Sequence, residues 1–228
     1  MTLLLIDKPF AMTSFQVIAA VRRQTGVKKV GHAGTLDPRA TGLLLVAVGR
    51  ESTKQLTQLI GLDKEYETEV LLGERRSTGD LEGEVVEEKS YQGDVSRELV
   101  EAALKSLVGS ILLPVSAYSA IKKGGVPFYK KARQAALRGE MIPEAELPKR
   151  AMVVYEALLF GIEKVADRLI IKVRFKVGSG TYIRSLGEEL GRRLGYPATL
   201  KSLRRTRVGE YQVVDAHDLI DYLLSPSK

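Results

Sequence analysis

The stretch Gly31-His32-Ala33-Gly34-Thr35-Leu36-Asp37-Pro38-Arg39-Ala40-Thr41-Gly42 brings a carboxylate, an imidazole ring and three glycines into one short segment. Glycine allows backbone conformations and close approaches that a Cβ atom forbids. Pro38 fixes its own φ and biases Asp37 toward an extended conformation. An apolar run at 43–48 follows directly and is long enough for a buried strand. We therefore expect a loop that presents Asp37 from a central strand.

A structural explanation of the same residues stays open. Asp and Pro form turns in many proteins, because Asp hydrogen-bonds to nearby backbone groups and Pro presets φ. A single histidine in a glycine-rich loop is most often a local hydrogen-bonding group. Neither Asp37 nor His32 alone establishes a catalytic function.

The composition is that of a folded protein with a basic balance. The chain has 228 residues, 44% of them hydrophobic and 28% charged, enough for a substantial core. Its 35 Lys and Arg against 28 Asp and Glu give a net charge of +7, which favours a polyanionic partner. With no Cys and only His32 and His217, the sequence offers neither a disulfide framework nor a zinc or iron–sulfur site. We expect no metal and no cofactor.

The first eight residues bear on location. They are apolar too briefly for a signal peptide or a membrane span, and they meet charge almost at once. We therefore expect a cytoplasmic protein that does not bind membranes. We also expect a monomer.

Strand and helix patterns intermix along the chain without an obvious repeat. Short apolar or alternating runs predict strands, and helical spacing with caps predicts helices. The predicted strands are 3–6, 43–48, 65–73, 84–89, 152–160, 168–177 and 198–208, and the predicted helices are 14–25, 51–60, 95–107, 128–138, 183–194 and 215–224. Antiparallel neighbours outnumber regular βαβ units, which indicates an α+β fold with a mixed, mostly antiparallel central sheet flanked by helices and loops. The length allows one large domain or two small ones.

Several motifs together resemble those of one family. Residues 31–42 resemble the GHxGxLDPxATG signature of the TruB family of tRNA pseudouridine synthases. Lys8-Pro9 is similar to the family's KPxGxTS segment, with Ala11 at the usual Gly position, and Lys64-Glu65-Tyr66 is similar to its KxY. The segments 77–83, 114–122 and 128–138 resemble TDTxDxxG, PPxYSAxK and YxxAR. The resemblance covers nearly the whole chain and implies the pseudouridine synthase fold, with a catalytic cleft, as a single catalytic domain over residues 1–228.

Two later segments complete the resemblance. Residues 178–186 resemble SKGTYIRSL, with Ser179 at the usual Lys position, and 203–205 resemble the family's LRR. Without the family, the simplest explanation of Arg184 is a surface i,i+4 pair with Glu188, and Arg204 and Arg205 fit a solvated basic strand. Fuller family members continue into a PUA RNA-binding domain, which we expect to be missing from a chain that stops at residue 228.

The resemblance implies a reaction and a set of roles. It implies that the chain isomerises uridine 55 in the T-loop of tRNA to pseudouridine, after the base has been flipped out of the folded RNA. Asp37 is then the nucleophile, Arg184 pairs with it and keeps it ionised, and Tyr66 stacks on the uracil. His32 fills the vacated stack, and Leu203 closes the apolar side of the pocket. Further substrate contacts fall on Lys8, Tyr118, Lys122, Tyr182, Arg204 and Arg205.

Other functions stay open or are disfavoured on chemical grounds. A hydrolytic glycosidase normally needs two carboxylates at a set separation, and no second acid in these motifs is an obvious partner for Asp37. A nucleotide-binding P-loop is disfavoured because the glycine loop lacks GK[ST]. A non-catalytic tRNA-binding or folding protein, or a synthase acting on another RNA, remains open. The sequence also leaves open whether Asp37 attacks C1′ or C6, or abstracts a ribose proton on the way to a glycal.

Overall fold

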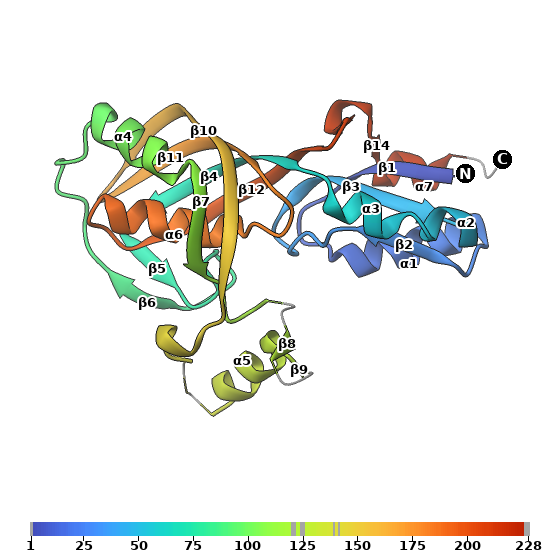
Figure 1. The fold of residues 1–228 in the computed structure, drawn as a ribbon, viewed down its shortest axis with the longest axis horizontal. Coiled ribbons are helices and arrows are strands. Elements are labelled where there is room, and N and C mark those ends of the chain that lie inside the picture. The colour runs from blue at the N-terminus through green and yellow to red at the C-terminus, as the bar shows by residue number, and fades with distance from the viewer. Residues whose placement is uncertain (1, 120–121, 124–125, 139, 141, 226–228) are drawn as a thin grey trace. The chain divides into compact units, whose positions relative to one another are not determined.

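The computed structural model describes residues 2–119, 122–123, 126–138, 140 and 142–225. The chain forms two compact units, whose elements are labelled in Figure 1. Unit 1 comprises residues 1–67, 176–179 and 202–228, and unit 2 comprises 68–175 and 180–201. Residues of both units occur in the strands β4 (Lys64–Leu72), β11 (Arg168–Val177) and β12 (Ala198–Val208).

Unit 1 has the strand order β14-β1-β3-β12-β4. β3 (Thr41–Val48) is antiparallel to both β1 (Thr2–Lys8) and β2 (Val30–Ala33), and it is parallel to β12. The remaining elements of unit 1 are α1 (Ser14–Thr25), α2 (Arg50–Thr53), α3 (Leu56–Gly61), β13 (Tyr211–Gln212), η2 (Val213–Asp215), β14 (His217–Asp218) and α7 (Leu219–Leu224).

The core of unit 1 is organised around β3. Successive side chains of a strand point to opposite faces, so a strand buried on both faces serves two apolar clusters. One cluster joins alternate residues of β3 to α1, and it includes Leu44, Val46, Val17, Ile18 and Val21. The other uses the opposite face of β3 and includes Leu43, Leu45, Ala33, Leu59 and Val208. The predicted central strand at 43–48 is therefore confirmed.

Helix α1 begins and ends where its sequence predicts. The Thr13 side chain accepts from Gln16 N while the Gln16 side chain accepts from Thr13 N, which is a capping box. At the other end Gly26 adopts a left-handed conformation with φ of 68°. The capping box fixes the start of α1 directly after the turn that follows β1, and Gly26 fixes its end.

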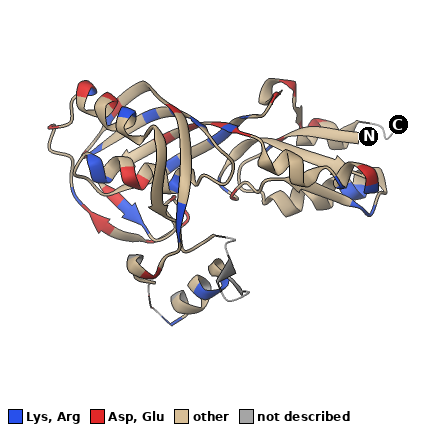
Figure 2. Ribbon diagram, viewed as in Figure 1, with Lys and Arg blue, Asp and Glu red and all other residues tan. Residues whose placement is uncertain are grey.

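Unit 2 has the strand order β12-β4-β11-β10-β7 and a separate β5–β6 hairpin. Helix α4 (Arg97–Leu107) packs against β10 (Lys149–Val165) and against α6 (Ile183–Arg193). The remaining elements are β5 (Glu74–Arg76), β6 (Val85–Glu88), β7 (Gly109–Pro114), β8 (Lys122–Lys123), β9 (Val126–Pro127), α5 (Phe128–Ala136) and η1 (Glu144–Glu146). In Figure 2 the basic β5 lies beside the acidic β6, and Arg75 binds Glu87 across that hairpin at 3.0 Å.

The α+β class with a mixed sheet flanked by helices is confirmed, and two predicted helices are corrected. The helix predicted at 51–60 is two short helices, because the chain tightens where Gln55 N donates to Ser52 O at 3.1 Å. The helix predicted at 215–224 starts only at Leu219, because His217 pairs with Ile6 in the sheet and Asp218 caps the helix. Among the described residues, none of the helices combines the length and apolar character needed to cross a membrane.

Candidate active site

The loop that carries Asp37 joins β2 to β3 in unit 1. Ser14, 2% exposed at the start of α1, brackets Leu36, since its hydroxyl donates to Leu36 O at 3.1 Å and accepts from Leu36 N at 2.9 Å. Ala40 N donates to Asp37 O at 3.1 Å and closes the turn. Asp37 itself is only partly buried. The fold thus fixes the backbone on both sides of Asp37 and leaves the residue partly exposed.

Lys8, at the end of β1, fastens a neighbouring turn to this loop. Its side chain is fully buried, and Nζ donates to Pro9 O at 2.9 Å, Met12 O at 2.6 Å and Pro38 O at 3.2 Å. A buried ammonium group needs such acceptors to offset its lost hydration. The structure gives Lys8 a supporting position, and its contact with substrate stays a prediction.

Ala11 lies in the same turn, at the position where the resembling motif has glycine. Its φ is 61°, in the left-handed region that favours glycine. The backbone therefore keeps the conformation of the glycine pattern although the residue is alanine.

Arg205 of β12 supports the Asp37 loop from the other side. It is 1% exposed, and its guanidinium donates to Leu43 O at 2.8 Å and to Gly34 O at 3.1 Å. Gly42 is its partner in the parallel register, with φ of 101°, and a Cβ there would lie 2.2 Å from Arg205 O. The expectation of a solvated basic strand is wrong for Arg205, because the carbonyls of Gly34 in the loop and of Leu43 in β3 accept hydrogen bonds from its buried guanidinium.

The other two residues of the LRR segment are less buried. Arg204 binds Asp7 with both terminal nitrogens, at 3.1 and 2.6 Å, and also reaches the Thr41 hydroxyl at 3.4 Å. Leu203 is half-buried on β12, which neighbours β4 in the strand order. The predicted substrate contacts of Leu203, Arg204 and Arg205 stay predictions.

The two predicted ring contacts, His32 and Tyr66, also belong to unit 1. Burial, followed by the charge of Arg205, lowers the pKa of His32, so its ring is neutral at pH 7. Within the described part of the chain, the buried Nδ1 of His32 has no hydrogen-bond partner. Tyr66 is 8% exposed and lies on the buried face of β4 with Thr68 and Val70, as the alternation predicts.

Lys64 is a residue for which the sequence analysis assigned no role. It is 6% exposed, and Nζ donates to Ile60 O at 2.6 Å, Leu62 O at 2.5 Å and Ser179 Oγ at 3.4 Å. Burial, and next the charge of Arg205, lower its pKa to about 8, although Asp63 acts in the opposite direction. A lysine at 179, usual in the resembling motif, would bring a second ammonium group toward Lys64.

Arg184 is the predicted catalytic residue of unit 2. It stands in the first turn of α6, 6% exposed, and donates to Thr78 O at 2.8 Å and to Ser116 Oγ and Tyr118 O, both at 3.3 Å. The alternative of a solvated surface pair with Glu188 is wrong, because residues far away in the sequence enclose the guanidinium. Its predicted pairing with Asp37 stays a prediction.

Asp80 lies close to Arg184 and was not assigned a role from the sequence. Its Oδ2 is 3.9 Å from Arg184 Nη1, and its Oδ1 accepts from the Thr78 hydroxyl at 2.6 Å and from Glu82 N at 3.0 Å. The signal that pointed here was the resemblance of 77–83 to TDTxDxxG, in which Asp80 fills the second Asp position. The carboxylate compensates the buried charge of Arg184 within unit 2.

The remaining predicted contacts of unit 2 are Tyr182, Tyr118 and Lys122. Tyr182 is the residue before α6 and is half-buried. Tyr118 N donates to Ser116 Oγ at 3.2 Å, and Tyr118 lines a pocket of about 1360 Å³. Lys122 belongs to β8, and its side chain lies outside the described residues.

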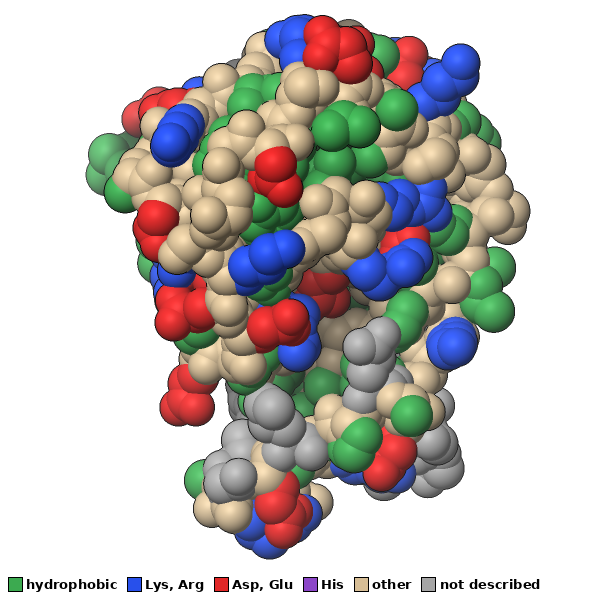
Figure 3. Space-filling model, turned by 90° about the vertical axis from the view of Figure 1, so that its left-hand side faces the viewer, with side chains coloured by type: hydrophobic (Ala, Val, Ile, Leu, Met, Phe, Trp, Pro, Cys, Tyr) green, Lys and Arg blue, Asp and Glu red, His purple; other side chains and the backbone are tan. Residues whose placement is uncertain are grey.

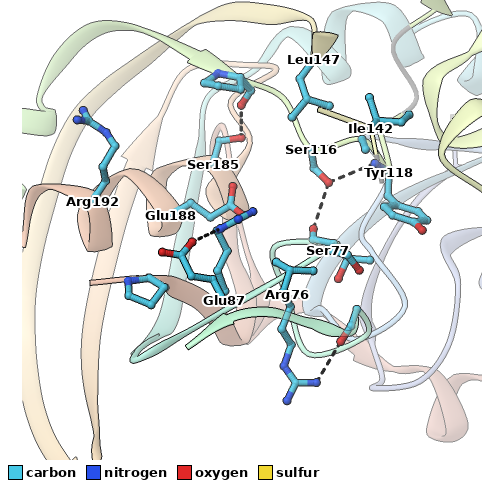
Figure 4. Close-up of a pocket in the computed structure, with 18 of the residues that line it drawn as sticks. Arg76, Ser77, Glu87, Ser116, Tyr118, Ile142, Leu147, Ser185, Glu188 and Arg192 are labelled. Atoms are coloured by element: carbon cyan, nitrogen blue, oxygen red, sulfur yellow. Dashed lines mark hydrogen bonds and ion pairs between the residues drawn. The ribbon is translucent and has the colours of Figure 1, made fainter. Parts of the chain in front are cut away.

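The pocket is confined to unit 2. Figure 3 shows that side of the molecule with acidic and basic side chains intermixed. In Figure 4, Ser116 and Tyr118 line it together with Ile142, Leu147 and Glu188. Asp37, His32 and Tyr66 are not among its lining residues. In the described part of the chain, no cluster of three potential metal-ligating side chains occurs. The expectation of no metal stays a prediction.

Solved structures define the fold class. The chain resembles a chain of "Crystal Structure of a Cbf5-Nop10-Gar1 Complex", with a TM-score of 0.69 and 26% identity over 97% of this chain and 53% of that one. A similar match, with a TM-score of 0.68 and 26% identity, is to "Structure of H/ACA RNP bound to a substrate RNA containing 2'-deoxyuridine". This chain spans about half the length of those chains. The fold is the pseudouridine synthase fold.

Sequence relatives define the family. Residues 22–183 match the TruB family pseudouridylate synthase N-terminal domain. The chain is 44% identical over 219 residues to tRNA pseudouridine synthase B of Leifsonia xyli, covering 95% of this chain and 70% of that protein. It is 41% identical to tRNA pseudouridine synthase B of Desulfotalea psychrophila, covering 96% of this chain and 86% of that protein. The chain belongs to the TruB family of pseudouridylate synthases.

Proposed function

We propose that this protein converts a uridine of tRNA to pseudouridine, and that the uridine is position 55 in the T-loop. The relatives that cover most of this chain are named as tRNA enzymes, and the net charge of +7 suits an RNA substrate. The observation that carries the proposal is the Asp37 loop of a TruB-family chain, braced by Ser14, Lys8 and Arg205.

The reaction breaks the bond from ribose C1′ to uracil N1, turns the base and rejoins it through C5, with loss of the C5 proton. Asp37 supplies a carboxylate nucleophile, which suits a reversible covalent adduct. Arg184 has the role of keeping that carboxylate ionised, since a guanidinium fork favours the charged form.

Three further residues receive the flipped nucleoside. Tyr66 stacks on the uracil, and Leu203 covers its apolar edge. His32 takes the place that the base leaves in the RNA. A neutral imidazole suits that position, because a flat uncharged ring stacks between bases, and the lowered pKa of His32 keeps it uncharged at pH 7.

The test is tritium release from tRNA labelled at C5 of uridine. We expect the protein to release tritium from unmodified tRNA, and Asp37→Asn to lower the rate at least about a thousand-fold while tRNA binding survives. Asp215→Asn makes the same chemical change at an exposed residue of unit 1 and serves as the control.

Two outcomes contradict the proposal. Turnover retained by Asp37→Asn rules out the nucleophile. A protein that binds tRNA but releases no tritium is the non-catalytic tRNA-binding alternative. Mapping pseudouridine in tRNA from cells lacking the gene tests position 55.

A further inference from the structure

Phe10 and Arg39, the latter in the Asp37 loop, form a cation–π pair. The guanidinium carbon of Arg39 lies 5.0 Å from the centre of the Phe10 ring. Both residues stand at unrestricted positions of the motifs that this chain resembles, Phe10 in KPxGxTS and Arg39 in LDPxATG. The pair is therefore a feature of this chain rather than of the motifs.

The backbone on both sides of the pair is fixed. One ammonium group, that of Lys8, holds Pro9 O and Met12 O around Phe10, and it also holds Pro38 O next to Arg39. Because Lys8 is fully buried, this clamp is shielded from competing water. The ring and the guanidinium thus project from a rigid base instead of from a loose loop.

Both partners keep a bonding surface open. Phe10 is 54% exposed, a large fraction for a phenylalanine. Within the described residues, Arg39 has no hydrogen bond or ion pair besides this ring contact. A guanidinium in a cation–π contact can still donate its N–H groups to an anion. The pair offers an aromatic face and an anion-binding edge side by side.

We propose that Phe10 and Arg39 bind the RNA strand next to the reacting uridine. A nucleobase stacks on the free face of the Phe10 ring, and an adjacent phosphate accepts from Arg39. Single-stranded RNA presents the complementary groups, a flat base that stacks on a ring and a phosphate one step along the backbone that binds a cation. Arg39 lies two residues after Asp37, which fits a nucleotide neighbouring the target. The inference rests on the proposed function, because it takes RNA as the substrate.

The first test is the affinity for a T-arm hairpin RNA, measured by fluorescence anisotropy. An Asp37→Asn background prevents turnover during the titration. We expect Phe10→Ala and Arg39→Ala each to weaken binding about ten-fold, and Phe10→Tyr, which keeps the ring, to restore most of it.

Matched controls come from exposed residues of the same type elsewhere in the chain. Phe160→Ala removes a phenylalanine that is also 54% exposed, on β10 of unit 2, and Arg50→Ala removes an exposed arginine from α2. We expect less than a two-fold change for either. A loss at Phe10 no larger than that at Phe160 overturns the proposal.

A second test locates the stacked base. Each nucleotide flanking the target uridine is replaced in turn by an abasic nucleotide. At one position the abasic RNA and Phe10→Ala should not add, because each removes the same stack. Losses that add at every flanking position overturn the stacking, even if affinity falls.

The salt dependence separates the role of Arg39. We expect Arg39→Ala to lower the slope of log affinity against log salt by about 0.7 to 1, the value of one phosphate contact, and Phe10→Ala to leave the slope unchanged. An unchanged slope for Arg39→Ala overturns the phosphate contact. If the unaltered protein releases no tritium from tRNA, the proposed function fails, while these titrations still report whether the pair binds RNA.

Discussion

Buried cations in both units donate hydrogen bonds to uncharged oxygens, but in unit 2 a carboxylate also lies close to the cation. In unit 1 the hydrogen-bond acceptors of Lys64 and Arg205 are uncharged oxygens, mostly main-chain carbonyls. In unit 2 the carboxylate of Asp80 lies 3.9 Å from Arg184 and compensates it. The charge of Arg205 therefore still acts on its surroundings, and it lowers the pKa of both His32 and Lys64. Unit 1 thus keeps positive potential around His32 and Lys64, which suits an RNA strand.

The largest expected effect concerns the backbone fit in unit 1. Gly42→Ala should lower the free energy of unfolding by at least about 3 kcal/mol, because φ is 101° and the new Cβ would collide with the backbone of Arg205. Gly26→Ala is the control, since its φ of 68° carries strain but nothing lies within 4 Å of a Cβ. It should cost only about 1 kcal/mol.

Urea denaturation of both variants measures the difference. Equal losses for Gly42→Ala and Gly26→Ala would mean that the close contact between β3 and β12 does not constrain the loop. In that case the close approach of the Gly42 and Arg205 backbones would not hold the loop of the proposed nucleophile in place.

The next largest effect is a pH dependence of stability that we expect for Lys64 of unit 1 but not for Arg184 of unit 2. Lys64 is protonated up to about pH 8 in the folded protein and up to about 10.5 when unfolded. Between these values the unfolded state binds more protons, so the contribution of Lys64 to the free energy of unfolding rises with pH. The shift corresponds to a ceiling of roughly 3 kcal/mol.

Two methionine variants test this difference. Relative to Lys64→Met, the unaltered protein should gain stability as the pH rises from 8 to 10.5. Arg184→Met should be destabilised by a constant amount over the same range, because a guanidinium does not lose its proton there. Urea denaturation at several pH values measures both. A pH-independent difference at Lys64 would show that its charged form is as stable inside the protein as in water.

The sequence predicted features that depend on neighbouring residues and missed contacts between residues far apart in the chain. The Asp37 loop could be recognised from its glycines, Pro38 and the following apolar run, because those signals are local. The bounds of α1 at residues 14–25 were predicted correctly for the same reason, since its caps are local signals. The contacts of Arg184 were missed, because Thr78, Ser116 and Tyr118 lie 66 to 106 residues away in the chain.

The burial of charged residues in strands was also missed from the sequence. Arg205 and Lys64 look like solvent-facing positions, since a charge in a strand usually faces water. Each is buried because main-chain carbonyls accept hydrogen bonds from it, Ile60 O at the end of α3 for Lys64 and Gly34 O of the loop for Arg205. No local sequence pattern indicates which main-chain carbonyls will be available as acceptors, so the burial of such Lys and Arg side chains can be recognised only from the structure.

The smallest expected effect compares one residue in each unit. Ala11 in unit 1 and Ala166 in unit 2 have φ of 61° and 51°, left-handed values that cost alanine about 1–2 kcal/mol. Changing either to glycine removes that strain but adds chain entropy to the unfolded state, worth about 0.4–1 kcal/mol. Each change should therefore stabilise the protein by somewhat less than about 1 kcal/mol, or about 2 °C in Tm. Equal gains would show that φ alone sets the effect, whereas a loss at Ala11 would mean that the turn carrying Phe10 needs the stiffness of alanine more than relief from strain.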